Sequence, residues 1–298
     1  MSVHILGLGS IGTICAHLLV ASKSYKVLYL PRKPSSRAYT LVQPNGRETK
    51  LKDLVNDNNS TTPIEVLLIT TKENQTKSAL RPIFKRISKQ TLLIFLQNGM
   101  GIVDYIRPYL PSQRIVLGTT TNAANRTKED RKVHWVHEGE TYFAPEPSTS
   151  LSPEETKLIS TLGTLEPFST LETRLYRKLA LNACINPVTA LFNMPNRFVA
   201  EPGYFVHDLA KILAKEIQTV YAAVKLEMDI STLYEDIFKL AEDTRDNISS
   251  MLADVRAKRE TEIEFINGYI VKLAYKAGIE VIENEAIVRK IKELAYHE

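Results

Sequence analysis

The stretch "VHILGLGSIGTICAHLLVAS" at residues 3–22 decides the fold of the N-terminal half. Its first part, "VHILGL", is a compact apolar run that ends at glycines and predicts a buried strand, and "GTICAHLLVAS" follows with helical periodicity. Where the two meet, the chain matches G-x-G-x-x-G with Gly7, Leu8, Gly9, Ser10, Ile11 and Gly12. Between a strand and a helix, this spacing is typical of a dinucleotide-binding turn. A plain strand–helix turn is the less favoured alternative.

Each glycine of this motif has a separate reason to be there. The first makes the tight turn, the second admits a pyrophosphate, and the third lets helix and strand pack closely. The start of the helix then offers backbone amides and the positive end of the helix dipole. The six residues of the motif are therefore candidate cofactor-binding residues.

Strand-like and helical runs continue to alternate through the first half. The runs "KVLYL" at 26–30, "IEVLLITT" at 64–71 and "TLLIFLQN" at 91–98 predict further buried strands, which favours a parallel doubly wound sheet. A hairpin is expected around Asn45-Gly46 in "AYTLVQPNGRETKL". The strands expected near residues 114–144 follow one another more closely and suggest an antiparallel extension.

The second half has few strand signals. Helices are expected over 172–194, 203–228, 231–252 and 262–278. Ser152, Pro153 and Glu155 predict a helix start, Thr261 and Glu264 have the spacing of a capping box, and Gly278 fits a helix end. We therefore expect an α/β protein with an N-terminal Rossmann-type doubly wound domain over 1–167 and a C-terminal all-helical domain over 168–298.

Composition is ordinary for a globular protein. The 298 residues carry a net charge of +4, with 44% hydrophobic and 24% charged residues. Without a concentrated basic run, nucleic-acid binding is not indicated, and no apolar run reaches the length of a membrane span. Cys15 and Cys184 lie in apolar helical patterns, which fits a reducing compartment and no metal site. A cytoplasmic protein is expected; a mitochondrial location without a cleavable leader stays open, as does the choice between monomer and homodimer.

The second predicted strand bears on the choice of dinucleotide. NAD-binding folds usually place an acid at its end, whereas "KVLYLPRKPSSR" offers Arg32, Lys33 and Arg37. A guanidinium pairs with a 2′-phosphate, which favours NADP(H). Lys72, after the strand "IEVLLITT", is a second candidate for that phosphate. For each residue a solvated basic loop remains the alternative, and Arg32 is the first choice.

Another candidate follows the strand ending at residue 97. Asn98 in "FLQNGMG" lies where the carboxyl ends of parallel strands face the ligand crevice. An amide there can orient a nicotinamide or a substrate. On spacing alone, a simple turn at Asn98-Gly99 is the better interpretation.

A polar line runs along the apolar helix of "LYRKLALNACINPVTALFNMPN" at 175–196. Lys178, Asn182 and Asn186 recur every fourth position and share one side of the helix. A reductase needs a proton donor for the developing alkoxide and amides to orient a polar substrate, and a desolvated lysine is a workable acid. A wet face with a surface lysine is the alternative. Pro187 favours the active interpretation slightly, because it loosens the helix and frees backbone groups.

A second polar cluster lies in "DNISSMLADVRAKRETEIEFING". Asn247 and Ser250 are three positions apart, which predicts one helical face. Glu262 stands at the start of the last predicted long helix, where a lone glutamate is usually a surface residue favoured by the dipole.

Several ordered segments together resemble the ketopantoate reductase (2-dehydropantoate 2-reductase) family, across nearly the whole chain. They are "GLGSIG" at 7–12, "LQNGMG" at 96–101, "GTTT" at 118–121, "RKLALNACINPVTALFNMPN" at 177–196 and "NISSMLADVRAKRETEIEFINGYIV" at 247–271. The last two are specific to the family, whereas the glycine loop is not. The resemblance implies NADPH-dependent reduction of 2-dehydropantoate to pantoate, in pantothenate and coenzyme A synthesis, with the active site in the cleft between two domains.

The resemblance also implies roles for single residues. Lys178 stands at the position of the general acid to the ketone oxygen, and Glu262 at that of a glutamate that contacts the substrate hydroxyl and helps in proton handling. Asn98 matches a residue that touches nicotinamide and substrate. Arg32 and Lys72 match the pair that grips the 2′-phosphate. Substrate-binding positions of the family are matched by Asn182, Asn186, Asn196, Asn247 and Ser250.

Two departures from the family pattern are visible. "RAKRE" precedes Thr261 where many relatives have a proline, and residues 122–134 are longer and more charged than expected. Neither removes a candidate residue. A reductase of another branched 2-oxo acid and a non-catalytic NADPH-binding scaffold remain the alternatives.

Overall fold

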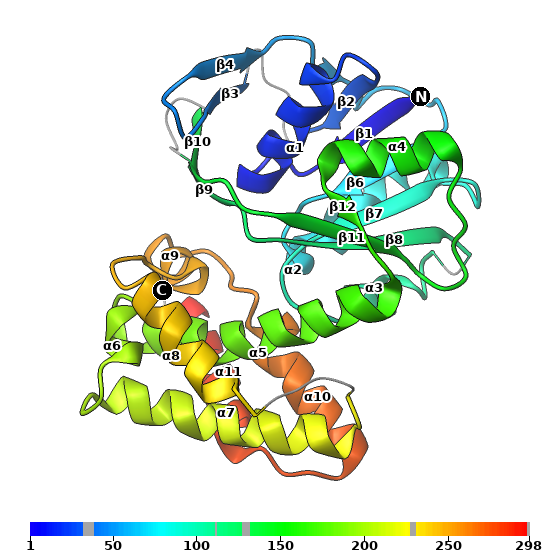
Figure 1. Ribbon diagram of the computed structural model, residues 1–298. Helices are drawn as coiled ribbons and strands as arrows, with labels where there is room; N and C mark the ends of the chain where they lie inside the picture. Colours follow the sequence, from blue (N-terminus) through cyan, green and yellow to red (C-terminus); the bar gives the residue numbers. More distant parts are fainter. Residues whose placement is uncertain (32–38, 111, 127–131, 227–230, 297–298) are drawn as a thin grey trace. The chain divides into compact units, whose positions relative to one another are not determined.

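The computed structural model describes residues 1–31, 39–110, 112–126, 132–226 and 231–296. The chain forms two compact units (Figure 1). The first contains Met1–Gln97 and Ile106–Leu171, and the second contains Asn98–Tyr105 and Glu172–Glu298. A single domain boundary after residue 167 stays a prediction, and it does not describe the short segment Asn98–Tyr105, which groups with the helices.

The first unit is built on an eight-stranded sheet of the described residues, in the order β12-β11-β8-β7-β6-β1-β2-β5. Pairing is parallel from β5 to β8 and antiparallel between β8 and β11. The predicted doubly wound sheet and part of its antiparallel extension are therefore confirmed. Its strands are β1 (Ser2–Leu6), β2 (Lys26–Leu30), β5 (Val55–Asn56), β6 (Val66–Ile69), β7 (Leu92–Leu96), β8 (Arg114–Thr120), β11 (Thr141–Pro145) and β12 (Thr164–Leu165).

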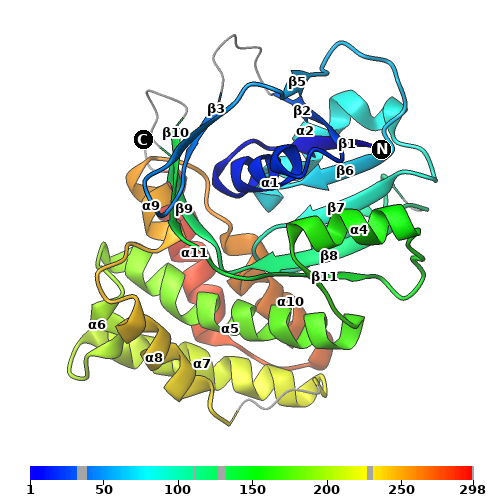
Figure 2. The ribbon, with the colours of Figure 1, turned by 45° about the horizontal axis from the view of Figure 1, so that its top comes forward.

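Helices lie on both faces of this sheet, as Figure 2 shows. One face carries α1 (Ser10–Ala21) and α4 (Pro153–Leu162), which contact each other. The other face carries α2 (Glu73–Leu80), which runs into the 3₁₀ helix η1 (Arg81–Arg86). The chain order reverses between β1 and β6, so the ends of these two strands form the topological switch point, where open α/β sheets bind ligands.

A second, four-stranded sheet covers the far side of α1. It contains β3 (Tyr39–Val42), β4 (Glu48–Leu51), β9 (Ala123–Arg126) and β10 (Lys132–His137). Ile14 of α1 packs with Leu41, Val133 and Trp135 of this sheet, whereas Cys15 and Leu19 pack on the main sheet. The expectation that all later strands extend the main sheet is therefore wrong for β9 and β10. The physical reason is that α1 has apolar residues on two sides, and each side is buried against a different sheet.

Three local predictions are confirmed. Ser152 and Glu155 form the reciprocal hydrogen bonds of a capping box at the start of α4. The hairpin β3–β4 turns at Gly46, whose φ is +83°. Gly278 ends a helix in the left-handed conformation, with φ at +69°.

The second unit is helical. Its elements are α5 (Phe168–Phe192), α6 (Arg197–Ala200), α7 (Phe205–Ala223), α8 (Leu233–Asp243), α9 (Ser250–Arg256), the 3₁₀ helix η2 (Ile263–Phe265), α10 (Asn267–Ala277) and α11 (Ile282–Tyr296). The short α3 (Ile102–Ile106) follows the segment that begins at Asn98. Aliphatic faces of α5, α7, α10 and α11 share one core. Within the described ranges, no helix is both long and apolar enough to cross a membrane.

The single helix expected over 231–252 is wrong. The chain forms α8, then a connection, then α9, because Ser249 caps a new helix by accepting a hydrogen bond from the N–H of Leu252 at 3.1 Å. The helix expected over 262–278 also begins later, at Asn267. Here the Phe265 carbonyl accepts the N–H of Met100 at 2.9 Å, so this carbonyl bonds outside the helix. Thr261 and Glu264 form no capping box, because the N-cap of η2 is Glu262 and that of α10 is Ile266.

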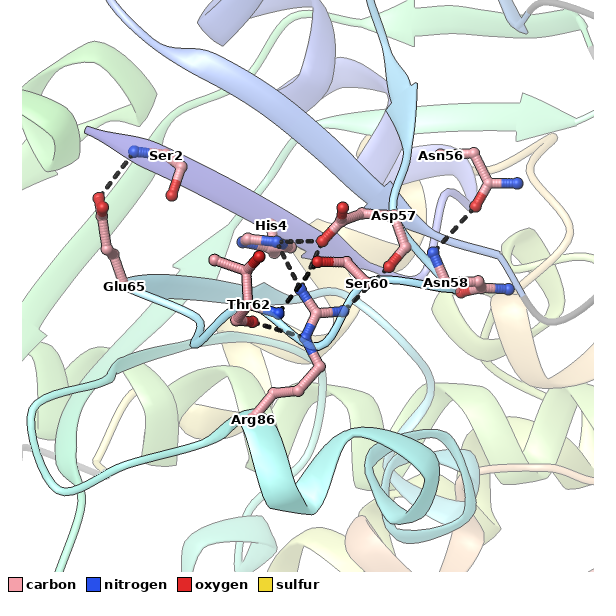
Figure 3. Close-up of polar contacts among 9 residues, drawn as sticks. All are labelled: Ser2, His4, Asn56, Asp57, Asn58, Ser60, Thr62, Glu65 and Arg86. Atoms are coloured by element: carbon pink, nitrogen blue, oxygen red, sulfur yellow. Dashed lines mark hydrogen bonds and ion pairs between the residues drawn. The ribbon is translucent and has the colours of Figure 1, made fainter.

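A buried ionic cluster stabilises the first unit (Figure 3). His4 of β1 lies 2.8 Å from the Asp57 carboxylate, and the Arg86 guanidinium from η1 bonds the same carboxylate. Arg86 also donates to the carbonyls of Thr62 and Asp57 at 2.8 and 3.0 Å. Burial alone would raise the pKa of Asp57, but hydrogen bonds from Arg86 and His4 outweigh it and lower this pKa. The cluster therefore joins an ionised carboxylate to both its neighbours.

Replacing Arg86 by leucine is expected to lower the free energy of unfolding by about 3 kcal/mol, because it leaves the largely buried Asp57 carboxylate without its main countercharge. Urea unfolding measures this loss. Adding Asp57→Asn to the same variant should recover part of it. A double variant as unstable as Arg86→Leu alone would contradict the charge argument and assign the loss to packing.

Candidate active site

The glycine loop after β1 has the geometry that a dinucleotide-binding turn requires. Gly7 has φ at +103°, and a Cβ there would lie 2.7 Å from the backbone nitrogen of Thr71. A Cβ at Gly12 would lie 2.1 Å from the Gly7 carbonyl oxygen. A Cβ at Gly9, in contrast, would meet nothing within 4 Å. The loop thus combines a tight turn, an open face and a close packing contact, which fits a pyrophosphate above Gly9.

The first turn of α1 lies directly behind this open face. Gly9 is its N-cap and has no side chain to occupy the amides of the first turn. The carbonyl of Gly7 accepts the hydroxyl of Thr70 at 2.6 Å, which ties the loop to the end of β6. Backbone amides at a helix start favour an anion, and they lie here at the switch point of the sheet.

Lys72 is held at the end of β6 by neighbours that the sequence analysis did not select. It is the N-cap residue of α2, half-buried, and its carbonyl accepts the Thr76 hydroxyl at 3.0 Å. Gln97, at the end of β7, donates to the Thr71 carbonyl at 2.5 Å and to Thr76 at 2.7 Å. Position after a buried strand was the available signal for Gln97. These bonds orient the backbone from which the Lys72 side chain extends.

Arg32 lies outside the described residues, together with Lys33 and Arg37. Its contact with a 2′-phosphate stays a prediction.

The polar line of α5 becomes more buried along the helix. Lys178 and Asn182 are half-buried, and Asn186 is 8% exposed. The alternative of a wet face therefore does not hold for Asn186. An amide at that depth needs hydrogen-bonding partners, which a polar ligand can supply.

The segment that begins at Asn98 is held against η2. Met100 donates its N–H to the Phe265 carbonyl at 2.9 Å, and a Cβ at Gly99 would lie 2.5 Å from that carbonyl oxygen. The residue before η2 is Glu262, which is 6% exposed. The expectation of a surface glutamate is therefore wrong. Two candidates far apart in the sequence, Asn98 and Glu262, flank one backbone contact.

The start of α10 connects this contact to α5. The hydroxyls of Tyr269 and Tyr176 lie 3.5 Å apart, and a Cβ at Gly101 would meet the Tyr269 ring at 2.8 Å. Burial raises the pKa of both phenols, so both stay protonated at neutral pH. Tyr176 lies on α5 just before Lys178, so the stretch carrying the candidate acid lies near the segment of Asn98.

Asn196 and Asn247 are joined through the backbone. The N–H of Asn196 donates to the Asn247 carbonyl at 3.1 Å, and the Asn196 side-chain amide donates to Thr244 at 2.9 Å. Among the described residues, Oδ1 of Asn196 is buried without a partner. A buried acceptor of this kind fits a residue that completes its hydrogen bonds with a ligand.

Ser250 lies near α5 because its neighbour Ser249 is hydrogen-bonded to that helix. The hydroxyl of Thr189, one turn after Asn186, donates to Ser249 at 2.8 Å, which ties the start of α9 to α5. The prediction that Asn247 and Ser250 share one helical face is wrong, because the Ser249 cap starts α9 at Ser250 and leaves Asn247 in the preceding connection. Both side chains are exposed in the structure.

Family models cover both halves of the chain. Residues 3–148 match the model described as "Ketopantoate reductase PanE/ApbA", and residues 170–295 match "Ketopantoate reductase PanE/ApbA C terminal". The chain belongs to the ketopantoate reductase family. The resemblance seen in the sequence is confirmed, and the chain is an oxidoreductase with a Rossmann-type domain.

Relatives of this ketopantoate reductase family member match over nearly their full length. A 2-dehydropantoate 2-reductase of Shigella flexneri is 28% identical and covers 98% of this chain and 94% of its own. The crystal structure of a probable 2-dehydropantoate 2-reductase from Bacillus subtilis is 28% identical, with a TM-score of 0.79 and coverages of 99% and 100%. A D-mandelate dehydrogenase, solved with NADH and anilino(oxo)acetate, is 20% identical with a TM-score of 0.84 and coverages of 99% and 98%. The last shows likeness of fold alone.

The two cysteines of this family member are not reactive. Cys184 lies on α5 between Asn182 and Asn186, and Cys15 lies on α1; both are buried free thiols. Burial raises the pKa of Cys15 to about 12 and raises that of Cys184 as well. Neither is a thiolate at neutral pH, so neither is a candidate nucleophile.

Proposed function

We propose that this protein reduces 2-dehydropantoate to pantoate with NADPH, a step in pantothenate and coenzyme A synthesis. The observation that carries the proposal is the gathering of family-matched polar residues around α5. The hydrogen bond from Thr189 to Ser249 holds Ser250 near Asn186. The hydrogen bond from Met100 to Phe265 pairs the segments of Asn98 and Glu262. Full-length similarity to proteins named 2-dehydropantoate 2-reductase supports the same substrate.

In this proposal the first unit holds the dinucleotide. The open face at Gly9 and the amides of α1 receive the pyrophosphate, and Lys72 with Arg32 pairs with the 2′-phosphate. When bound, NADPH supplies the hydride for the keto carbon. The empty space at Gly9, which any side chain would fill, supports the fit of the dinucleotide.

The second unit holds the 2-oxo acid and the proton. Lys178 donates a proton to the ketone oxygen as negative charge develops there, and Asn182 and Asn186 orient the substrate by hydrogen bonds. Glu262 contacts the substrate hydroxyl and assists in proton handling. Asn98 contacts nicotinamide and substrate. Further substrate contacts come from Asn196, Asn247 and Ser250.

The decisive experiment follows NADPH oxidation at the nicotinamide absorbance with 2-dehydropantoate, a panel of other branched 2-oxo acids, and NADH as the control reductant. We expect turnover with 2-dehydropantoate and a strong preference for NADPH. Faster turnover of another 2-oxo acid would replace the substrate, and a preference for NADH would remove the roles of Arg32 and Lys72. Dinucleotide binding without turnover of any 2-oxo acid would leave a non-catalytic scaffold.

A further inference from the structure

Pro187 leaves one backbone carbonyl of α5 without its helical partner. In an α-helix the N–H of residue 187 would bond to the carbonyl of Ala183, but proline has no N–H. Ala183 is fully buried, so solvent does not replace the lost bond. An unpaired buried carbonyl is costly, so another donor is needed.

The donor is the side chain of Asn267, the first residue of α10. Its Nδ2 lies 2.9 Å from the Ala183 carbonyl oxygen, and the residue is 0% exposed. The sequence analysis expected that Pro187 would free backbone groups to bind something. In the structure, the Ala183 carbonyl left free by Pro187 is bonded by a side chain of the same protein, Asn267.

A chain of hydrogen bonds fixes the Asn267 amide in this orientation. Its second N–H donates to Oδ1 of Asn284 at 3.0 Å, and Nδ2 of Asn284 donates to the Glu216 carboxylate at 2.8 Å. Glu216, on α7, also accepts the N–H groups of Glu283 and Asn284 at 3.0 and 2.9 Å, at the start of α11. Because the Ala183 carbonyl and Oδ1 of Asn284 are both acceptors, the nitrogen of the Asn267 amide has to face them.

We infer that Asn267 is a positioning residue for the reaction, which acts by holding the turn of α5 at Ala183. Two proposed substrate contacts flank that turn: Asn182 precedes Ala183, and Asn186 precedes Pro187. Asn267 also follows η2, the segment that begins next to Glu262. One side chain therefore sets the spacing between the amides of α5 and the segment of the proposed glutamate. This inference rests on the proposed function.

The test compares four variants in the 2-oxo acid assay. Asn267→Leu keeps the shape of the side chain and removes the donor. Pro187→Ala restores a backbone N–H that can pair with the Ala183 carbonyl, alone and combined with Asn267→Leu. Ile270→Ala, on the same helix and fully buried, is the control for a loss of stability alone. If Asn267→Leu does not fold, Asn267→Ala removes the same donor with a smaller side chain.

We expect Asn267→Leu to lower kcat/KM by about 10- to 100-fold, mainly through KM for the 2-oxo acid, with the Kd of NADPH unchanged. Pro187→Ala should recover most of that loss in the double variant, and Ile270→Ala should unfold earlier without changing kcat/KM. An unchanged kcat/KM in Asn267→Leu, or the same loss with and without Pro187→Ala, would overturn the inference alone. A wild-type protein that reduces no 2-oxo acid would overturn the proposed function, and this inference with it.

Discussion

Replacing Lys178 by alanine is expected to lower kcat for 2-oxo acid reduction by about 100- to 10,000-fold, because the alkoxide then forms without a positioned proton donor. The Kd of NADPH should stay within experimental error of the wild type, since Lys178 is proposed to contact the ketone oxygen and is not among the proposed dinucleotide contacts. Stopped-flow measurement of NADPH oxidation at saturating substrate gives the rate, and fluorescence titration gives the Kd.

Two matched variants sharpen this prediction. Lys178→Arg keeps the charge but is too weak an acid to give up its proton, so it should stay close to Lys178→Ala in kcat. Arg177→Ala removes the neighbouring cation of α5, which is exposed and pairs with Asp236 at 2.6 Å, and should leave kcat unchanged. A Lys178→Arg variant with nearly full kcat would show that charge, and not proton donation, is what the position contributes.

Replacing Gly9 by valine is expected to raise the Kd of NADPH by about 100-fold or more, because the side chain would enter the space proposed for the pyrophosphate and displace charge-assisted hydrogen bonds from the start of α1. Stability should change little, since a Cβ at Gly9 meets nothing within 4 Å and the backbone is extended there, with φ at −83°. Isothermal titration gives the Kd, and urea unfolding gives the stability.

Gly12→Ala is the control from the same motif: here we expect the main effect on stability and not directly on NADPH binding. Its Cβ would lie 2.1 Å from the Gly7 carbonyl oxygen and 2.5 Å from the Thr70 hydroxyl, so the variant should lose about 1–3 kcal/mol of unfolding free energy through forced backbone shifts. Binding would suffer only as a consequence of that shift. Equal effects of the two substitutions on stability, or normal NADPH binding by Gly9→Val, would contradict the pyrophosphate site.

Local sequence determined much of the first unit. The strand, the glycine turn and the helix at residues 3–22 are set by neighbours in the chain, since Gly7 needs a positive φ and Gly12 a close approach that no other residue tolerates. The same holds for the Ser152 capping box and the hairpin at Gly46. Strand–helix alternation was then enough to predict the doubly wound order, because parallel strands require crossovers.

The sequence also determined that Lys178, Asn182 and Asn186 share a side of one helix, because helical spacing is a local property. Periodicity did not reveal how deeply each residue lies. Nor did it reveal that the carbonyl freed by Pro187 is taken by Asn267, because the two residues are distant in the chain and meet only when α10 packs on α5.

Only the tertiary structure decided where the later helices begin. Residues 231–252 and 262–278 carry enough helical pattern to predict two long helices, yet Ser249 bonds to Thr189 of α5 and Phe265 bonds to Met100. The first bond fixes the Ser249 hydroxyl that caps α9, and the second directs the Phe265 carbonyl to a distant segment. The first bond brings the start of α9, next to Ser250, to α5, and the second pairs the segments of Asn98 and Glu262. Local helix propensity is worth only a few tenths of a kcal/mol per residue, which one such hydrogen bond can outweigh. Long-range contacts therefore set these breaks, and with them the candidate site.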